Sequence, residues 1–276
     1  MAYDGSESSK NALRQSVRLA RAEKSWIKVV AVVPSFDGDL DLTGVRDVSK
    51  VIEGPARKFL AEAVEIAQAE GSSIITNIEQ GEAYEKIVDV ASAENCDLIV
   101  MGRRGRGHLH KALMGSVTAR VIGHTDRDVL VIPRESQVGW CKILLPTDGS
   151  KYSEAAADRA IDFAKSYGGE IAAVSVVDVT EEFHVEAPDI VDKLVIKAKA
   201  VVEDFKKKSG AAGVKAEGFV REGEAHDVIT GLAKEVGAEL VIMGSHGRTG
   251  IKRLLMGSVT EKVIGQAACP VLVVRS

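Results

Sequence analysis

The chain has 276 residues, of which 45% are hydrophobic and only 4% aromatic, and its formal net charge is −4 at pH 7. This balance gives no overall basic field to attract nucleic acid, and no apolar run approaches the roughly 18 residues that a membrane span needs. The N-terminus lacks a signal-peptide pattern, and three dispersed cysteines indicate neither a disulfide framework nor a zinc site, which favours a cytoplasmic protein.

The first half of the chain alternates helices with strands. Apolar residues at helical spacing predict a helix from Ser6, its N-cap, to about Lys24, and the β-branched run 27–33 predicts a buried strand. A polar loop, 34–48, follows. The remaining elements of this half are predicted as helices over 49–71, 82–95 and 116–124 and as strands over 73–79, 97–101 and 129–132.

A short polar junction, 134–139, separates two similar halves, and we place the domains at 1–138 and 139–276. The second half repeats the series with a loop between 178 and 189. Its strands are predicted over 142–147, 170–178, 214–221, 239–243 and 271–275, and its helices over 151–167, 189–209, 225–236 and 258–267. This alternation predicts an α/β fold: two tandem, doubly wound parallel sheets, each a Rossmann-like three-layer α/β/α domain.

The first half begins without a full first strand. An apolar strand precedes Asp148 in the second half, whereas only Met1, Ala2 and Tyr3 precede the matching Asp4. The first strand of such a sheet is usually central, so its loss would leave a gap. Either the chain as given is trimmed or the first sheet is irregular, and we favour trimming.

A glycine-rich stretch occurs twice, 142 residues apart, each time after a predicted strand and before a predicted helix. The spacing G-x2-G-x9-G-S is met at Gly102, Gly105, Gly115 and Ser116, and again at Gly244, Gly247, Gly257 and Ser258. A period this long indicates tandem domains and not a solenoid. Glycines let a ligand approach the backbone, and the unpaired N–H groups of a helix start favour a phosphate.

Ligands of doubly wound sheets bind beyond the carboxyl ends of the strands. Asp148 ends the first predicted strand of its half, and Gly244 ends the fourth. If these two strands are neighbours, a carboxylate for ribose hydroxyls and N–H groups for phosphates flank one crevice. The arrangement predicts a nucleotide site.

With these residues both halves resemble the universal stress protein family, and the chain is similar to its tandem members over nearly its whole length. The resemblance implies a fold like that of the adenine nucleotide α-hydrolases. The ATP-binding branch of the family carries the same glycine signature, so the resemblance implies ATP or AMP as the ligand, with Mg²⁺ or Mn²⁺ accompanying the phosphates.

The resemblance also implies roles for particular residues. In the second half Pro146, Thr147 and Asp148 would line the adenosine, with Asp148 on the ribose, and Val176 would present main-chain groups to the adenine. Met243 and Gly244 would contact ribose and base. The phosphates would be bound by Gly247, Arg248, Gly257, Ser258, Val259 and Thr260. The matching set of the first half is Asp4, Val32, Met101, Gly102, Gly105, Arg106, Gly115, Ser116, Val117 and Thr118, with Tyr3 in place of Thr147.

Other interpretations of these residues are weaker. Neither copy is a Walker P-loop, and the six histidines show no metal-ligand spacing. Ser245 and His246 suggest a nucleophile with its base, but adjacent residues seldom face each other, and Arg103 replaces Ser245 in the first copy. The first glycine-rich loop contains a basic stretch, which a loop that faces solvent explains about as well as polyphosphate binding does. The stretch comprises Arg103, Arg104, Arg106, His108, His110 and Lys111.

Our leading hypothesis is a cytoplasmic tandem universal stress protein that binds ATP or AMP as a regulatory or sensory ligand in a stress response, with at most slow hydrolysis. The alternatives are an enzyme that hydrolyses adenine nucleotides or adenylates a substrate, and an interaction scaffold that needs no nucleotide. The last strands of the two halves, 129–132 and 271–274, are predicted edge strands, and we expect them to pair as an internal pseudo-dimer. A homodimer and a protein partner stay open.

Overall fold

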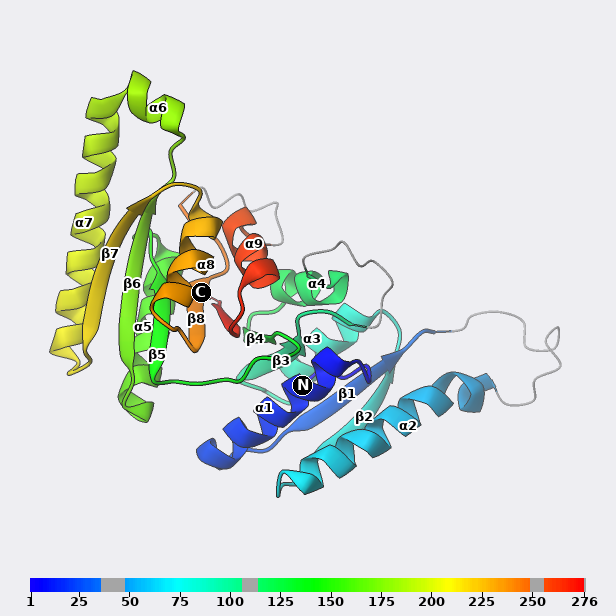
Figure 1. Cartoon of the computed structure of the whole chain (residues 1–276). Helices are drawn as coiled ribbons and strands as arrows, with labels where there is room; N and C mark the ends of the chain where they lie inside the picture. Colours follow the sequence, from blue (N-terminus) through cyan, green and yellow to red (C-terminus); the bar gives the residue numbers. More distant parts are fainter. Residues whose placement is uncertain (36–47, 106–113, 249–255, 276) are drawn as a thin grey trace. The chain divides into compact units, whose positions relative to one another are not determined.

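The computed structural model describes residues 1–35, 48–105, 114–248 and 256–275 (Figure 1). These residues fall into two compact units of alternating strands and helices. Unit 1 comprises Met1–Arg127 and Val131–Glu135, and unit 2 comprises Asp128–Leu130 and Ser136–Ser276. The two units hold one copy each of the glycine stretch, and each unit is described below by itself.

Unit 1 contains the predicted series of elements. They are α1 (Glu7–Glu23), β1 (Lys28–Val33), α2 (Val48–Ala69), β2 (Ile75–Gln80), α3 (Ala83–Ala93), β3 (Leu98–Gly102), α4 (Ser116–His124) and the end of β4 (Asp128–Ile132), whose first three residues belong to unit 2. The Ser6 hydroxyl accepts the Ser9 N–H and so caps α1, as the sequence predicts. β1 pairs with β2 in parallel, and β3 lies beside β4. The core is aliphatic and includes Leu13, Val29 and Leu60.

The first three residues occupy the position of the missing first strand. They form no strand, but Ala2 makes a parallel bridge with Val30 of β1. The Ala2 N–H donates to the Val100 carbonyl of β3 at 3.0 Å, and the Tyr3 N–H donates to the Val30 carbonyl at 2.9 Å. This short segment therefore bridges β1 and β3, which belong to two separate sheets.

Unit 2 is the more complete of the two. Its elements are β5 (Lys142–Pro146), α5 (Lys151–Tyr167), β6 (Glu170–Val177), α6 (Glu181–Glu186), α7 (Pro188–Ala211), β7 (Ala216–Glu222), α8 (Ala225–Glu235), β8 (Leu240–Gly244), α9 (Ser258–Gln266) and β9 (Val271–Val274). Its strands lie in the order β9-β8-β5-β6-β7, and every pair is parallel. Figure 1 shows α8 and α9 in front of this sheet and α5 behind it. The predicted α/β fold with a doubly wound parallel sheet is confirmed.

The core of unit 2 lies where its central strands meet these helices. Ile143, Leu144 and Leu145 of β5 and Ile242 of β8 are fully buried. Strands covered by helices on both faces are apolar along their whole length and do not alternate with polar residues. The central strand β5 therefore delivers Asp148 from a rigid base.

The segment between β6 and α7 was predicted as a loop, and this prediction is wrong. It contains the six-residue helix α6, whose N-cap is Thr180. The Thr180 hydroxyl accepts the Phe183 N–H, and His184 Nδ1 lies 3.0 Å from a carboxylate oxygen of Glu222 at the end of β7. A helix of six residues is too short to show apolar periodicity. It is held instead by the Thr180 cap and by the contact between His184 and Glu222.

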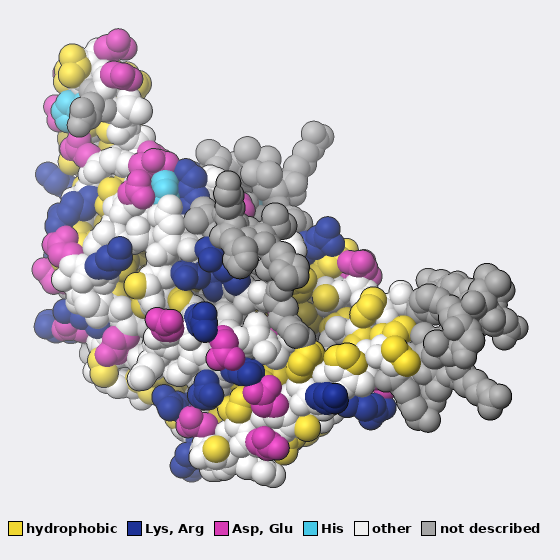
Figure 2. Space-filling view, turned by 45° about the vertical axis from the view of Figure 1, so that its right-hand side comes forward, with side chains coloured by type: hydrophobic (Ala, Val, Ile, Leu, Met, Phe, Trp, Pro, Cys, Tyr) yellow, Lys and Arg dark blue, Asp and Glu magenta, His cyan; other side chains and the backbone are white. Residues whose placement is uncertain are grey.

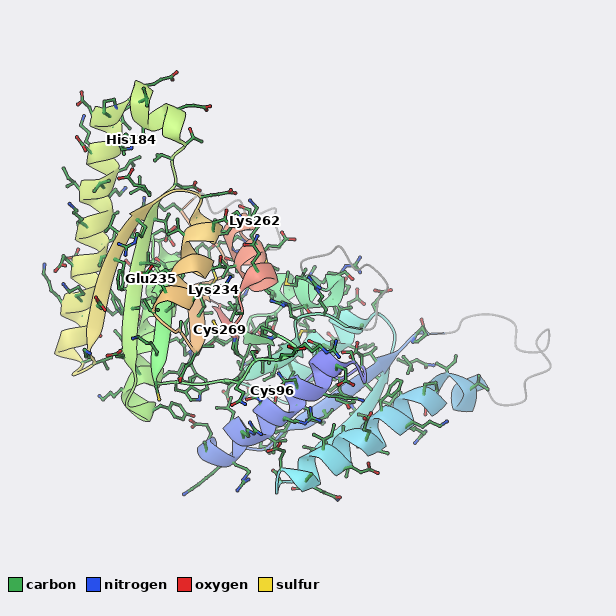
Figure 3. The ribbon with its side chains drawn as sticks, viewed as in Figure 1. Cys96, His184, Lys234, Glu235, Lys262 and Cys269 are labelled. Carbon is green, nitrogen blue, oxygen red and sulfur yellow. The ribbon has the colours of Figure 1, made fainter. Side chains whose placement is uncertain are left out.

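Charged side chains of both signs are interspersed over the described surface in Figure 2, which agrees with the small net charge. In the described part of the chain, no helix combines the length and the apolar character that crossing a bilayer requires. The three cysteines, two of which are labelled in Figure 3, are all free thiols.

Candidate functional site

Two strand ends meet at one edge of the unit 2 sheet. β5 and β8 are neighbours, with Ile143 beside Leu240 and Leu144 beside Val241. β5 leads into Asp148, and β8 ends at Gly244, where the glycine stretch begins. The condition on which the predicted crevice depends, that these strands are adjacent, is met.

Asp148 is held by main-chain N–H groups from two directions. Its Oδ1 accepts the Ser150 N–H at 3.0 Å, and its Oδ2 accepts the Arg248 N–H of the glycine stretch at 2.8 Å. Burial alone would raise the pKa of this carboxyl, but hydrogen bonds from Ser150, Ser153 and Arg248 together lower the pKa below its usual value. Asp148 is therefore ionised at neutral pH and faces the loop.

Thr147 and Val176 lie at the same edge of the sheet, on the side of β6. The Thr147 N–H donates to the Val174 carbonyl at 2.8 Å, and its buried side chain lies 3.4 Å from the Ser153 hydroxyl. Main-chain groups alternate in direction along a strand, so Val176 points its own toward β5, as Val174 does, but beyond the end of β5 at Pro146. Its N–H and C=O are placed where a planar ring could meet them.

The three glycines of the second copy differ in the space that each would leave for a side chain. A Cβ on Gly244 would lie 2.7 Å from main-chain atoms of Tyr152, so glycine is needed there for the approach of α5. A Cβ on Gly247 would lie 2.9 Å from Oδ2 of Asp148. A Cβ on Gly257 would lie at least 3.5 Å from its neighbours, which is an ordinary contact, so the fold itself does not require glycine at this position.

The start of α9 lies at the end of the glycine stretch. Gly257 is its N-cap and provides no side-chain cap, while Ser258 is exposed and Val259 is half-buried. The Thr260 hydroxyl is buried and donates to the Gly244 carbonyl at 3.0 Å, so in this arrangement only its N–H faces the helix start. The uncapped N–H groups and the helix dipole favour an anion here.

Met243 contributes through its main chain. Its side chain is buried in the core, although the sequence interpretation places it against ribose and base. Pro146 is half-buried at the end of β5. Both residues therefore lie at the ends of the two strands from which the site residues follow.

Ser245 and His246 do face each other. The Ser245 hydroxyl lies 3.2 Å from His246 Nδ1, which contradicts the premise that adjacent residues would not. Ser245 is only 1% exposed, however, so a substrate cannot reach its oxygen in this structure. The His246 ring packs 5.3 Å from the ring of Tyr152. Sequence reasoning missed Tyr152, because an aromatic residue in the first turn of a helix carries no signal of the loop that it will meet.

Unit 1 repeats much of this arrangement. Asp4 Oδ1 accepts the Ser6 N–H at 3.0 Å, and a Cβ on Gly105 would lie 2.5 Å from Asp4 Oδ2. The Thr118 hydroxyl donates to the Gly102 carbonyl at 3.2 Å. α4 begins after Gly115, again without a side-chain cap, at Ser116 and the exposed Val117. Val32 is half-buried on β1, Met101 is buried, and Arg106 lies outside the described residues.

Tyr3 differs from its counterpart Thr147. Its side chain is buried in the core between α1 and α2, and among the described residues its hydroxyl has no hydrogen-bond partner. Burial raises its pKa to about 12. Tyr3 therefore fills the core and does not line the opening.

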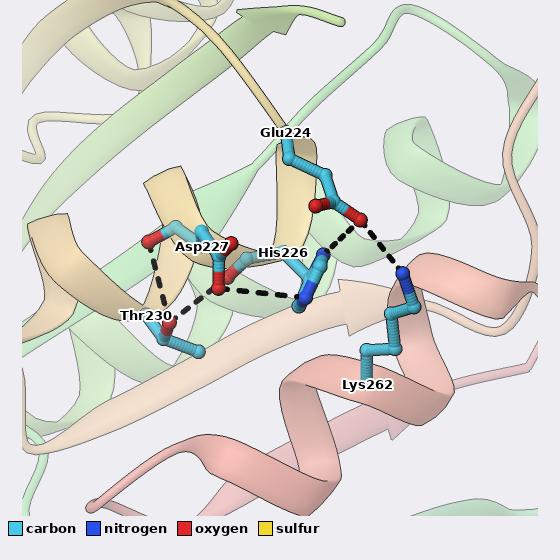
Figure 4. A network of polar contacts seen from close by, with 5 residues as sticks. All are labelled: Glu224, His226, Asp227, Thr230 and Lys262. Atoms are coloured by element: carbon cyan, nitrogen blue, oxygen red, sulfur yellow. Dashed lines mark hydrogen bonds and ion pairs between the residues drawn. The ribbon is translucent and has the colours of Figure 1, made fainter.

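A polar network joins α8 to α9 close to this edge (Figure 4). His226 is buried, with Glu224 Oε1 3.2 Å from its Nδ1 and Asp227 Oδ1 3.4 Å from its Nε2. The three ligand atoms lie within 4.8 Å of one another, as a cation site would require. The carboxylates meet opposite ring nitrogens, however, and the Lys262 ammonium already lies 2.7 Å from Glu224. The network is suited to fastening two helices and not to holding a metal ion.

Unit 1 has the same fastening with other residues. Arg120 of α4 lies 3.5 Å from Glu82, and its guanidinium lies 5.2 Å from the centre of the Tyr84 ring. Tyr84 stands at the position of His226. The link between the two helices is thus present in both units.

A separate pocket of about 380 Å³ lies at the opposite end of the unit 2 strands. It is lined by residues of the 136–139 segment, by the end of α8 including Lys234, and by Cys269 (Figure 3). Burial raises the pKa of the Cys269 thiol to about 11. None of the predicted site residues lines this pocket.

Comparison with known proteins gives consistent matches. The model of the universal stress protein family matches residues 1–133 and 140–275. A universal stress protein of Methanocaldococcus jannaschii is 39% identical over 148 residues, which is 52% of this chain and 87% of that protein. One from Mycolicibacterium smegmatis is 28% identical over 229 residues, 80% of this chain and 74% of the other.

A solved structure matches along the entire chain. The crystal structure of a universal stress protein from Archaeoglobus fulgidus aligns with a TM-score of 0.74 at 22% identity, covering 99% of this chain and 94% of that one. At this identity the likeness supports the fold alone.

Proposed function

Since this chain belongs to the universal stress protein family, we propose that it binds an adenine nucleotide, ATP or AMP, as a regulatory or sensory ligand at the β5/β8 edge of unit 2. The observation that carries the proposal is the juxtaposition of an ionised Asp148 with the uncapped start of α9, joined by the glycine stretch. A carboxylate suits ribose hydroxyls, and uncapped N–H groups suit phosphates.

The three parts of a nucleotide have separate positions in this proposal. The base lies against the main chain of Val176, the ribose against Asp148, and the phosphates at Gly257, Ser258 and Val259. Gly257 supports this assignment, because the fold does not require a glycine there and a side chain would project over residues 245–247. The absence of a side chain leaves room for a phosphate.

Mg²⁺ or Mn²⁺ belongs to the same proposal as a companion of the phosphates. When bound, such an ion would neutralise phosphate charge. The described residues around the start of α9 offer hydroxyl and N–H groups, and the carboxylate of Asp148 is held by two N–H groups. The ion would therefore be held by the nucleotide more than by the protein.

A ligand role is favoured over rapid turnover. Phosphoryl transfer needs a nucleophile in line with the phosphate and a positioned base. Ser245, the hydroxyl beside His246, is buried. Slow hydrolysis, a cytoplasmic location and action in a stress response complete the proposal.

The first repeat is proposed as a second site for the same class of ligand. It keeps the aspartate, the glycines and the uncapped helix, at Asp4, Gly105 and Gly115. Its opening differs because Tyr3 points into the core. The two sites are expected to differ in affinity.

The test is calorimetric titration of nucleotide-stripped protein with ATP, AMP and GTP. Gly257→Glu and Gly115→Glu place a carboxylate where each phosphate is proposed. Gly231→Glu is the matched control, because a side chain there meets nothing within 4 Å. We expect adenine-specific binding that Gly257→Glu abolishes and Gly231→Glu preserves. At a hundred times its Kd the ligand should stabilise the protein by about 2.7 kcal/mol.

An absence of heat with every nucleotide would contradict the proposal and would favour the scaffold alternative. Release of product from ATP faster than about one per second would favour the enzyme alternative, since this is an ordinary turnover rate.

A further inference from the structure

Among the described residues of the glycine stretch of unit 2, Arg248 attaches the stretch to the end of β5. The Arg248 N–H donates to Asp148 Oδ2 at 2.8 Å, and Arg248 Nε donates to the Asp148 main-chain carbonyl at 2.5 Å. Arg248 itself is exposed and lies 100 residues from Asp148 in the chain.

Gly247 fits this attachment. Its φ is not in the left-handed region, so backbone conformation does not demand glycine. What demands it is the carboxylate, because a Cβ at this position would lie 2.9 Å from Asp148 Oδ2. The middle glycine of the signature therefore leaves room for the aspartate.

The first repeat has the same relationship between other residues. A Cβ on Gly105 would lie 2.5 Å from Asp4 Oδ2, and Asp4 Oδ1 accepts the Ser6 N–H as Asp148 accepts that of Ser150. The aspartate and the middle glycine thus lie together in both units, although they come from different strand ends; Arg106, the counterpart of Arg248, lies outside the described residues.

We propose that Asp148 is a positioning residue that holds residues 244–248, the first part of the glycine stretch, in their binding shape and thereby couples ribose recognition to phosphate recognition. The inference rests on the proposed function for its ligand, but the attachment itself is made by protein groups alone. Each carboxylate oxygen has two lone pairs and uses one for a main-chain N–H. The remaining lone pairs are shared with the Ser150 and Ser153 side chains. Ribose hydroxyls can replace these side-chain donors without releasing the main-chain N–H of the loop.

Asparagine cannot replace the aspartate in this role. Its amide has one acceptor oxygen, so either the Ser150 N–H or the Arg248 N–H would face an NH₂ group. The lowered pKa of Asp148 has the same origin, because both N–H groups favour the ionised form.

Amide hydrogen exchange at Arg248, followed by NMR in nucleotide-free protein, tests the attachment. Asp148→Asn and Gly247→Ala should each raise the exchange rate of this N–H about tenfold or more, because they remove or crowd a hydrogen bond to a charged acceptor. Gly231→Ala is the control: its Cβ would meet nothing within 4 Å, so exchange at Arg248 should match wild type. Unchanged exchange in both Asp148→Asn and Gly247→Ala would overturn the proposal.

Titration with adenosine and ATP then separates positioning from direct contact. Gly247→Ala should weaken ATP binding about tenfold and adenosine binding much less, because the phosphates depend on the loop most directly. Asp148→Asn should weaken ATP more than adenosine. Equal losses for both ligands in Asp148→Asn, with no loss in Gly247→Ala, would reduce Asp148 to a ribose contact. If the two variants exchange the Arg248 N–H faster but the protein binds no nucleotide, the attachment of the loop by Asp148 is supported and only the proposed function is overturned.

Discussion

The hydroxyl of Thr260 donates to the main-chain carbonyl of Gly244 at 3.0 Å, and so ties the first turn of α9 to the end of β8. Thr118 makes the same bond to Gly102 in the other unit, at 3.2 Å. The first residue of each glycine stretch is thus fastened to the first turn of the helix that follows the stretch.

Thr260→Val should destabilise unit 2, because the isosteric side chain leaves the Gly244 carbonyl without its donor. We expect a loss of about 1–2 kcal/mol in the free energy of unfolding, and Thr260→Ser should recover most of it. Urea unfolding followed by Trp140 fluorescence measures this, in a Trp26→Phe background that leaves one tryptophan. Equal stability of the valine variant and wild type would show that solvent satisfies the carbonyl.

Gly244→Ala should be more damaging than its small volume suggests. The added Cβ would lie 2.7 Å from main-chain atoms of Tyr152, which cannot move away as a side-chain tip could. We expect a loss of about 1–3 kcal/mol. Gly231→Ala, within α8 and with nothing within 4 Å, should instead gain about 0.5–1 kcal/mol. The same unfolding assay applies, and a neutral Gly244→Ala would contradict the close packing of α5.

Tyr3→Phe should leave unit 1 as stable as before or stabilise it by up to about 1 kcal/mol, because it removes a buried hydroxyl that has no partner among the described residues. The pKa of Tyr3 is raised from 10.0 to about 12, so the folded state favours the protonated phenol. The stability that this pKa difference contributes to the folded state is complete below pH 10 and is lost as the pH rises toward 12. Comparing the alkaline unfolding of the two proteins tests this: Tyr3→Phe should flatten the decline.

Asp148 should stabilise the protein in the opposite pH range. Its pKa is lowered in the folded state, so its contribution is present above the unfolded value, near 3.8, and is lost as the pH falls through the lower folded value. Wild type should therefore be more stable than Asp148→Asn at pH 7, and the difference should shrink below pH 4. Acid unfolding of both proteins measures it. A stability difference between the two proteins that stays constant with pH would contradict the stabilising role of the ionised Asp148 carboxylate.

The three free thiols should react at different rates. Cys141 is exposed, whereas Cys269 is partly buried and its pKa is raised to about 11 by burial, which lowers its thiolate fraction. With iodoacetamide at pH 7.5, mass spectrometry should find Cys141 labelled first and Cys269 labelled quickly only after unfolding. Equal rates in the native protein would mean that the segment around Cys269 opens readily.

Much of the fold could be predicted from the amino-acid sequence. The repeat, the β-branched runs and the helical periodicity predict strands and helices whose bounds lie within about three residues of those observed. These features are local, so each segment carries its own signal. The helix α6 carries no such signal, because it depends on the Thr180 cap and on an ion pair with Glu222, 38 residues away from His184.

The candidate site divides in the same way. The glycine spacing and the aspartate after a strand are visible in the sequence, and they suffice to name Asp148, Gly247 and Gly257 as candidates. Only the tertiary structure decides what each does: Gly247 makes room for Asp148, Gly257 leaves space open, and the Thr260 hydroxyl faces inward. The reason is physical. Spacing determines which residues a strand delivers to the edge of a sheet, but a contact across 100 residues exists only after β5 and β8 have paired.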